Sequence, residues 1–136
     1  MPSFTEIRIG DVAEKSLLVS EKFVQDFAAL TGDDNPVHLD EKYAATSFFG
    51  QRVAHGVISA SLISTVLGTL LPGEGTIYLS QTLEFRKPVF LNETVTVKVA
   101  VKEKNERTKR VKLTTTATKG DGQVVLTGEA LVLCTK

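Results

Sequence analysis

The apolar positions in the first third of the chain recur with a helical spacing. Between Glu21 and Thr31 one apolar stripe falls at i, i+4 and i+7, formed by Phe23, Phe27 and Leu30. Ser20 is suited to cap the first turn, and Gly32 is a natural C-terminal stop. The pattern therefore predicts a helix from Glu21 to Thr31 that leads directly into Asp33.

Two further helices are predicted before the middle of the chain. Asp40 is suited to cap a short helix from Glu41 to Thr46, and we expect Phe48 and Phe49 after it to line a core or an apolar cavity. The run Gly56 to Pro72 is apolar on nearly every face, which predicts a helix enclosed by protein on most sides. It is shorter than the ~20 residues of a bilayer span, so a buried helix is favoured.

The second half of the chain alternates apolar and polar residues, which is typical of strands. Four strands are predicted, over Thr76–Phe85, Val95–Val101, Val111–Ala117 and Val124–Cys134. Hairpin turns are expected at 104–107 and 119–122, and Ile7, Ile9 and 17–19 suggest short strands or extended lead-in segments. The strands need a partner layer and the apolar helix needs enclosure, so we expect an α+β fold in which an antiparallel sheet wraps around that helix. Without repeats or linkers, residues 1–136 are expected to form a single domain.

Composition narrows the classes of partner. Sixteen basic and sixteen acidic residues cancel, so no global field favours nucleic acid or an anionic membrane. Cys134 is the single cysteine, which fits a reducing compartment. Met1 to Gly10 carries charges and no apolar core typical of a secretory signal. A cytoplasmic location is therefore expected.

Asp33 and His38 form the first candidate constellation. They flank Asn35-Pro36, which favours a turn, and lie in a segment expected to be irregular. A carboxylate beside a neutral imidazole can orient a water and exchange protons with it. Alternatively, Asp33 makes only a local turn and His38 covers an edge.

His55-Gly56 forms the second constellation, at the start of the long apolar helix. The first N–H groups of a helix lack intrahelical partners, and a glycine lets a carbonyl oxygen approach them closely. A thioester oxygen that gains negative charge would be stabilised there. For His55 itself, a local hydrogen bond that satisfies the helix start is the favoured interpretation.

Other candidate chemistry is weakly supported. Ser59, Ser61 and Ser64 lie on the apolar helix without a Gly-x-Ser-x-Gly elbow, and Gly56 to Pro72 contains no Asp or Glu. The sequence shows no metal-ligand spacing and no glycine-rich nucleotide loop, so no metal and no cofactor are expected. A basic cluster is interpreted as a solvated turn, with phosphates of an acyl carrier or coenzyme A as the alternative partner; it comprises Lys102, Lys104, Arg107, Lys109, Arg110 and Lys112.

The order of these motifs resembles a known family. Thr31 to His38, then Ala54-His55-Gly56, Leu79 to Phe85 and Pro88-Val89 are similar to the MaoC-like (R)-specific enoyl-CoA hydratases over nearly the whole chain. The resemblance implies a hot-dog fold, an antiparallel sheet wrapped around a long central helix. It also implies reversible hydration of trans-2-enoyl thioesters to (R)-3-hydroxyacyl thioesters, and a homodimer.

The resemblance assigns roles to single residues. Asp33 and His38 match the catalytic pair, and Gly56 matches the position whose backbone N–H receives the thioester oxygen. Asn35 and Ser64 match supporting positions, whereas Asp34 is expected to face solvent. Which of Asp33 and His38 is the base stays open.

Two other functions remain as alternatives. A hot-dog thioesterase would release free thiol, although the carboxylate-free helix argues against it. A non-catalytic acyl-thioester or acyl-carrier-protein binding module would bind without turnover, and the intact Asp/His pair argues against that. Chain length, coenzyme A versus acyl carrier protein, and the pathway (polyester precursors, fatty-acid synthesis or β-oxidation) are left open.

Overall fold

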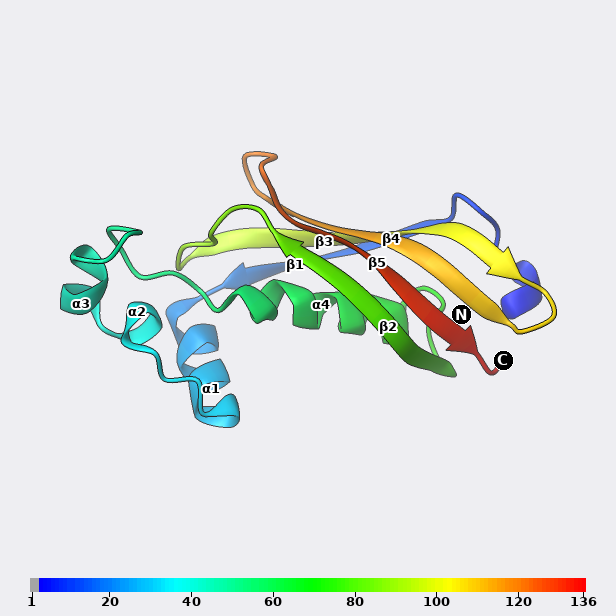
Figure 1. Ribbon diagram of the computed structural model, residues 1–136, viewed down its shortest axis with the longest axis horizontal. Helices are drawn as coiled ribbons and strands as arrows, with labels where there is room; N and C mark the ends of the chain where they lie inside the picture. The colour runs from blue at the N-terminus through cyan, green and yellow to red at the C-terminus, as the bar shows by residue number, and fades with distance from the viewer. Residues whose placement is uncertain (1–2) are drawn as a thin grey trace.

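The computed structural model describes residues 3–136, which form one antiparallel sheet over a central helix (Figure 1). The sheet has the strand order β1-β3-β4-β5-β2, with helix α4 (Gly56–Thr69) along one face. The strands are β1 (Val12–Val19), β2 (Thr76–Phe85), β3 (Glu93–Asn105), β4 (Arg110–Lys119) and β5 (Val124–Cys134). The predicted α+β architecture is confirmed.

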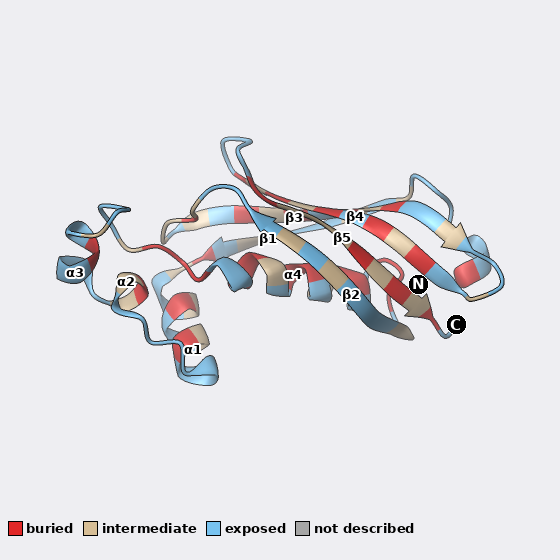
Figure 2. Cartoon of the chain, viewed as in Figure 1, coloured by how far each residue is buried: buried red, intermediate tan, exposed pale blue. Residues whose placement is uncertain are grey.

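The core lies between the sheet and α4. Alternate residues of β3 and β4 are buried, as the period of two predicts, and Figure 2 shows buried and exposed residues alternating along the strands. From α4 the buried apolar residues are Ile58, Leu62, Ile63, Val66 and Leu67. The buried residues of the strands and of α4 therefore form one core.

The other side of α4 departs from the prediction. Val57 is 48% exposed, and Ser61 and Ser64 are exposed as well. The expectation that this helix is enclosed on most sides is wrong for the single chain, because the sheet packs against one side only. Apolar composition around the helix did not distinguish the covered side from the open one.

The N-terminal segment supplies a fifth strand. The sequence 17–19 belongs to β1, which pairs antiparallel with β3 at one edge of the sheet. Ile7 is buried outside any strand, after the short 3-10 helix η1 (Phe4–Glu6), whereas Ile9 is 69% exposed. A strand is therefore confirmed for residues 17–19, whereas Ile7 and Ile9 lie in a lead-in segment outside the strands.

Three short helices gather at one end of the sheet (Figure 1). They are α1 (Glu21–Thr31), α2 (Pro36–Leu39) and α3 (Glu41–Ala45). Ser20 Oγ accepts a hydrogen bond from Phe23 N at 3.1 Å, and Asp40 Oδ1 accepts one from Tyr43 N at 3.1 Å, so both predicted caps are confirmed. None of the helices within residues 3–136 is long and apolar enough to cross a membrane.

Two predictions about this part of the chain are wrong for one residue each, whereas Phe23 and Phe27 of the predicted stripe are partly buried against the core. Leu30 is 86% exposed, because α1 buries the side that carries Val24 and Ala28. Phe48 is 98% exposed in the loop after α3 and lines no core, whereas its neighbour Phe49 lines a pocket. Local apolar spacing identified Phe23 and Phe27 but did not indicate that the stripe ends before Leu30.

Candidate active site

The end of α1 and the start of α2 place the candidate pair. Gly32 adopts a left-handed φ of 81° and ends α1, which turns the chain into Asp33. Asn35 then caps α2 by accepting a hydrogen bond from Val37 N at 3.2 Å, with Pro36 at the first helical position. The Asn-Pro pair thus begins a single helical turn, and His38 lies on that turn.

His38 is held in one tautomer. The residue is 9% exposed, and its Nδ1 lies 2.6 Å from the carbonyl oxygen of Val53. Because a carbonyl only accepts, Nδ1 carries the hydrogen and the neutral ring keeps its lone pair on Nε2. His38 therefore offers a proton acceptor at Nε2.

His55 contacts both members of the pair. Its Nε2 donates to the main-chain oxygen of Asp33 at 2.9 Å, and its ring lies on that of His38 with centroids 3.8 Å apart and planes tilted by 31°. Phe27 contacts the same ring at a centroid distance of 4.9 Å. The expected local role is wrong: His55 is the N-cap residue of α4 but makes no side-chain cap hydrogen bond, and it reaches 22 residues back along the chain.

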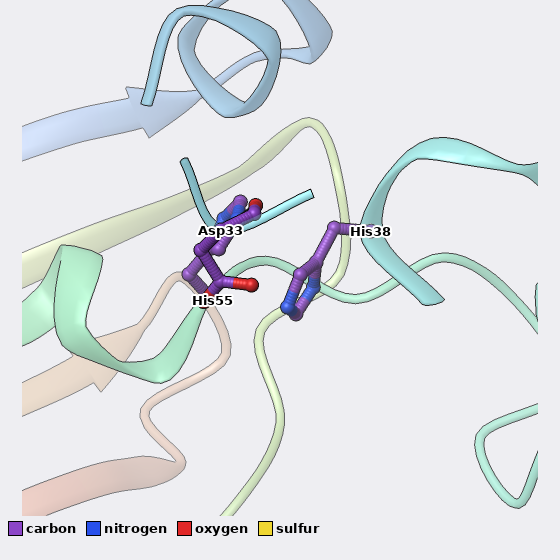
Figure 3. A group of neighbouring side chains, drawn as sticks. All are labelled: Asp33, His38 and His55. Carbon is purple, nitrogen blue, oxygen red and sulfur yellow. The ribbon is translucent and has the colours of Figure 1, made fainter. Parts of the chain in front are cut away.

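The three side chains meet between α2 and the start of α4 (Figure 3). One potential proton-exchanging atom from each of Asp33, His38 and His55 lies within 4.8 Å of the others. Two such groups can share one water, because a water hydrogen bond spans ~2.8 Å on each side. A carboxylate and two imidazoles are also possible metal ligands, but lone pairs lie in the ring planes, and two stacked rings do not direct them at a common point.

The pKa of His38 lies below the ordinary imidazole value of 6.5. Burial is the largest cause because it disfavours the charged ring, and the proximity of His55 acts in the same direction. The Val53 carbonyl and the Asp33 carboxylate oppose the shift. The neutral, proton-accepting form is therefore favoured near neutral pH.

A pocket of about 390 Å³ opens beside His38, within the size range of small-molecule sites. Its wall comes from α2, the start of α4, the end of β2 and the start of β5. The apolar lining residues include Val37, Phe49, Val53, Ala54, Phe85, Val89, Val125 and Leu126. Arg86 and Lys87 add positive charge to this lining. The pocket lining thus combines mostly apolar side chains with two positive charges.

Gly56 lies in that wall as the first residue of α4. A methyl group at this position would lie 3.1 Å from the ring carbons Cδ1 and Cε1 of Phe85. The backbone N–H at the start of α4 has no carbonyl one turn earlier to bond. Glycine therefore keeps a donor accessible from the pocket.

The two residues predicted to support the site lie in different places. Asn35 lines the pocket, whereas Ser64 lies on the exposed side of α4 in the single chain. The serine that lines the pocket is Ser59, which is 5% exposed. Sequence reasoning treated Ser59 only as a helix serine, although its position one turn after Gly56 places both on one face.

Three of the six residues of the basic cluster are paired within the chain. Lys104 Nζ donates to the carbonyl oxygens of Phe4 and Ile7 at 2.8 and 2.6 Å. Lys102 and Lys112 pair with neighbouring carboxylates, Lys102 with Glu129 and Lys112 with Glu103 and Glu129. These contacts favour the structural interpretation of this hairpin.

Comparison with known proteins finds relatives that match this chain over most of its length. The chain is 49% identical to a 3-hydroxybutyryl-CoA dehydratase of Methylorubrum extorquens over 93% of its own length and 79% of that protein. It is 45% identical to an (R)-specific enoyl-CoA hydratase of Rhodospirillum rubrum, over 96% of this chain and 90% of the other. Among solved structures, the unliganded R-hydratase PhaJ1 of Pseudomonas aeruginosa superposes with a TM-score of 0.93 at 44% identity, covering 97% of this chain and 84% of that one.

These relatives confirm the hot-dog fold and the resemblance found in the sequence. The protein-family model described as MaoC like domain matches residues 7–122 of this chain. This range contains Asp33, His38, His55 and Gly56. The chain belongs to the MaoC-like domain family.

Proposed function

We propose that this protein is an (R)-specific 2-enoyl-CoA hydratase, a hydro-lyase that adds water reversibly to trans-2-enoyl thioesters. The observation that carries the proposal is the Asp33–His38 pair, close enough to share one water beside a largely apolar pocket. Relatives over nearly the whole chain are named as hydratases and dehydratases of CoA thioesters. Asp33, His38 and Gly56 are the residues to which we assign the reaction.

The pocket supplies a way to activate the substrate. The Gly56 N–H donates to the thioester carbonyl oxygen, and the dipole of α4 favours the negative charge that gathers there. Polarisation of the carbonyl makes the β-carbon electrophilic. The apolar wall binds the acyl chain, and Arg86 and Lys87 suit the phosphates of coenzyme A or of an acyl carrier.

Asp33 and His38 then deliver the water. The water donates one hydrogen to the Asp33 carboxylate and the other to the free Nε2 of His38, which removes that proton as the oxygen attacks the β-carbon. The imidazolium formed is stabilised by the Asp33 charge. The proton taken up by His38 is then delivered to the α-carbon, so the elements of one water are added across the double bond.

The test is crotonyl-CoA hydration, followed by the loss of the conjugated enoyl absorbance. Asp33→Asn and His38→Ala should each lower kcat by about 10²–10⁴-fold, the usual contribution of acid/base groups. Asp34→Asn is the matched control, since this neighbouring exposed carboxylate lies outside the pocket lining and should leave kcat unchanged. Near-normal rates in both pair variants would refute the assignment.

Free-thiol release and acyl-CoA binding, measured beside this assay, separate the alternatives. A thioesterase would release free thiol from acyl-CoA, and a binding module would bind acyl-CoA without turnover. A series from crotonyl- to dodecenoyl-CoA with chiral analysis of the product gives the chain-length range and the stereochemistry. An (S) product would contradict the proposal.

We also propose a homodimer joined along β2. This strand is an edge of the sheet, and Ile77, Tyr78 and Leu79 are exposed on it. Light scattering should give twice the chain mass, and Leu79→Lys should shift the protein toward monomer. A wild-type monomer at micromolar concentration would refute this. A reducing cytoplasm is the proposed location, which suits the buried unpaired Cys134.

A further inference from the structure

His55 has no part in the steps assigned above, yet it touches both groups that carry them. It is 3% exposed and lies where α4 begins, directly before Gly56. Burial of a second histidine within 4.8 Å of the Asp33–His38 pair needs a physical reason.

Its two contacts reach different parts of the pair. The Nε2–H bond at 2.9 Å ends on the main-chain oxygen of Asp33, a residue that is otherwise tied by weaker local contacts: Thr31 Oγ1 accepts from Asp33 N at 3.2 Å. The face of the same ring lies against His38, whose Nδ1 is fixed by Val53. One side chain thus sets the position of Asp33 relative to His38.

The unused nitrogen of His55 argues against a purely structural role. Nδ1 is buried and has no hydrogen-bond partner among residues 3–136. An unsatisfied buried polar atom lowers stability, and most native buried polar atoms are paired. A phenylalanine would fill the space without that cost, and a glutamine would keep the donor, but neither gives a flat ring with a donor at its tip.

We propose that His55 is a positioning residue for the hydration reaction: its donor fixes the Asp33 main chain while its ring supports His38, so that both groups face one water. This inference rests on the proposed hydratase function. Misplacement of a reacting group by about 1 Å can cost 10²-fold in rate. His55 acts through the pair and needs no contact with substrate.

Variants can separate the donor from the ring. His55→Gln keeps an N–H donor at the end of a side chain of similar reach, whereas His55→Phe keeps the ring and loses the donor. His55→Met, of similar length and without a donor, is a second donor-less variant. Phe27→Leu removes the other ring in contact with His55 and leaves the donor in place.

We expect kcat for crotonyl-CoA to fall about 10²-fold in the two donor-less variants, with KM changed less than about threefold. His55→Gln should recover most of the loss, to within about tenfold of wild type, and Phe27→Leu should lie near wild type. Nitrogen chemical shifts of the His38 ring should keep the Nδ1–H tautomer in all variants, because Val53 fixes it. Circular dichroism and thermal melting report whether each variant is folded.

The outcomes distinguish failure of the proposed hydratase function from failure of the proposed role of His55. A wild-type protein that does not hydrate crotonyl-CoA refutes the proposed function, whatever the variants do. An active wild type with a folded His55→Phe of equal kcat overturns the role of His55 alone. Equal loss in His55→Gln and His55→Phe overturns the donor, and unfolding of both donor-less variants would make His55 a stability residue and overturn the proposal.

Discussion

The partly buried ion pair between Lys119 and Glu93 should stabilise the segment around Phe90, which supports the candidate site. Lys119 Nζ lies 3.0 Å from Glu93 Oε1, and the same oxygen accepts a hydrogen bond from Phe90 N at 2.7 Å. Phe90 pairs with Val53, whose carbonyl oxygen accepts from His38. Loss of the Glu93 charge should therefore affect both stability and the position of His38.

The magnitude follows from burial. Removal of one partner from a fully buried ion pair costs about 3–5 kcal/mol, because a charge is left without compensation. The Lys119 side chain is 6% exposed, but that of Glu93 is 32% exposed, so water reaches the pair. We therefore expect Glu93→Gln to cost about 1–2 kcal/mol. For a chain of this length that corresponds to a fall in Tm of about 4–7 °C.

Thermal melting and urea unfolding of single and double variants would measure this. Lys119→Met combined with Glu93→Gln should be less destabilised than the sum of the two single changes, because no unpaired charge remains. Glu103→Gln is a matched control, since Glu103 lies 3.7 Å from Lys112 with its side chain 61% exposed and should shift stability by less than about 0.5 kcal/mol. A Tm of Glu93→Gln within 1 °C of wild type would refute the reasoning.

Two further outcomes follow from the site. Gly56→Ala should lower kcat/KM by about 10–100-fold, because the added methyl meets the Phe85 ring at 3.1 Å beside the proposed donor; Gly68→Ala, with nothing within 4 Å, should leave activity unchanged and raise stability by about 0.5–1 kcal/mol. The folded-state pKa of His38 lies below 6.5. The midpoint of the acid-side loss of kcat/KM should therefore lie below pH 6.5. The unfolded chain then binds more protons than the native one just below pH 6.5, so the contribution of His38 to stability falls as pH falls; an acid limb at or above 6.5 would contradict this.

Local signals in the sequence were sufficient for most of the elements. Ser20 and Gly32 mark the ends of α1 because their chemistry acts on the nearest backbone groups. The alternation in β3 and β4 reports burial directly, since one side of the sheet faces α4. Strand β5 also matched its predicted bounds, Val124–Cys134.

Signals of apolar character were less informative where the covering layer is distant in sequence. Leu30 and Phe48 have apolar side chains, but nothing in residues 3–136 covers them substantially. For α4, periodicity showed a helix apolar all round, while the sheet covers one side. The apolar content of a segment predicts that some of it is buried, whereas the choice of side depends on which elements pack against it.

The site shows the same division between local and distant information. The proximity of Asp33 and His38 depends on a short turn, so the motif made it predictable. The tautomer of His38 depends on Val53, 15 residues away, and the Asp33 main chain is held by His55, 22 residues away. Residue chemistry alone could not connect these partners, because a buried histidine has two nitrogens and the sequence does not show which carbonyl each one meets. The position of Asp33 and the availability of His38 Nε2 are therefore properties of the packed α1–α2–α4 junction, which is where substitutions should separate catalysis from folding.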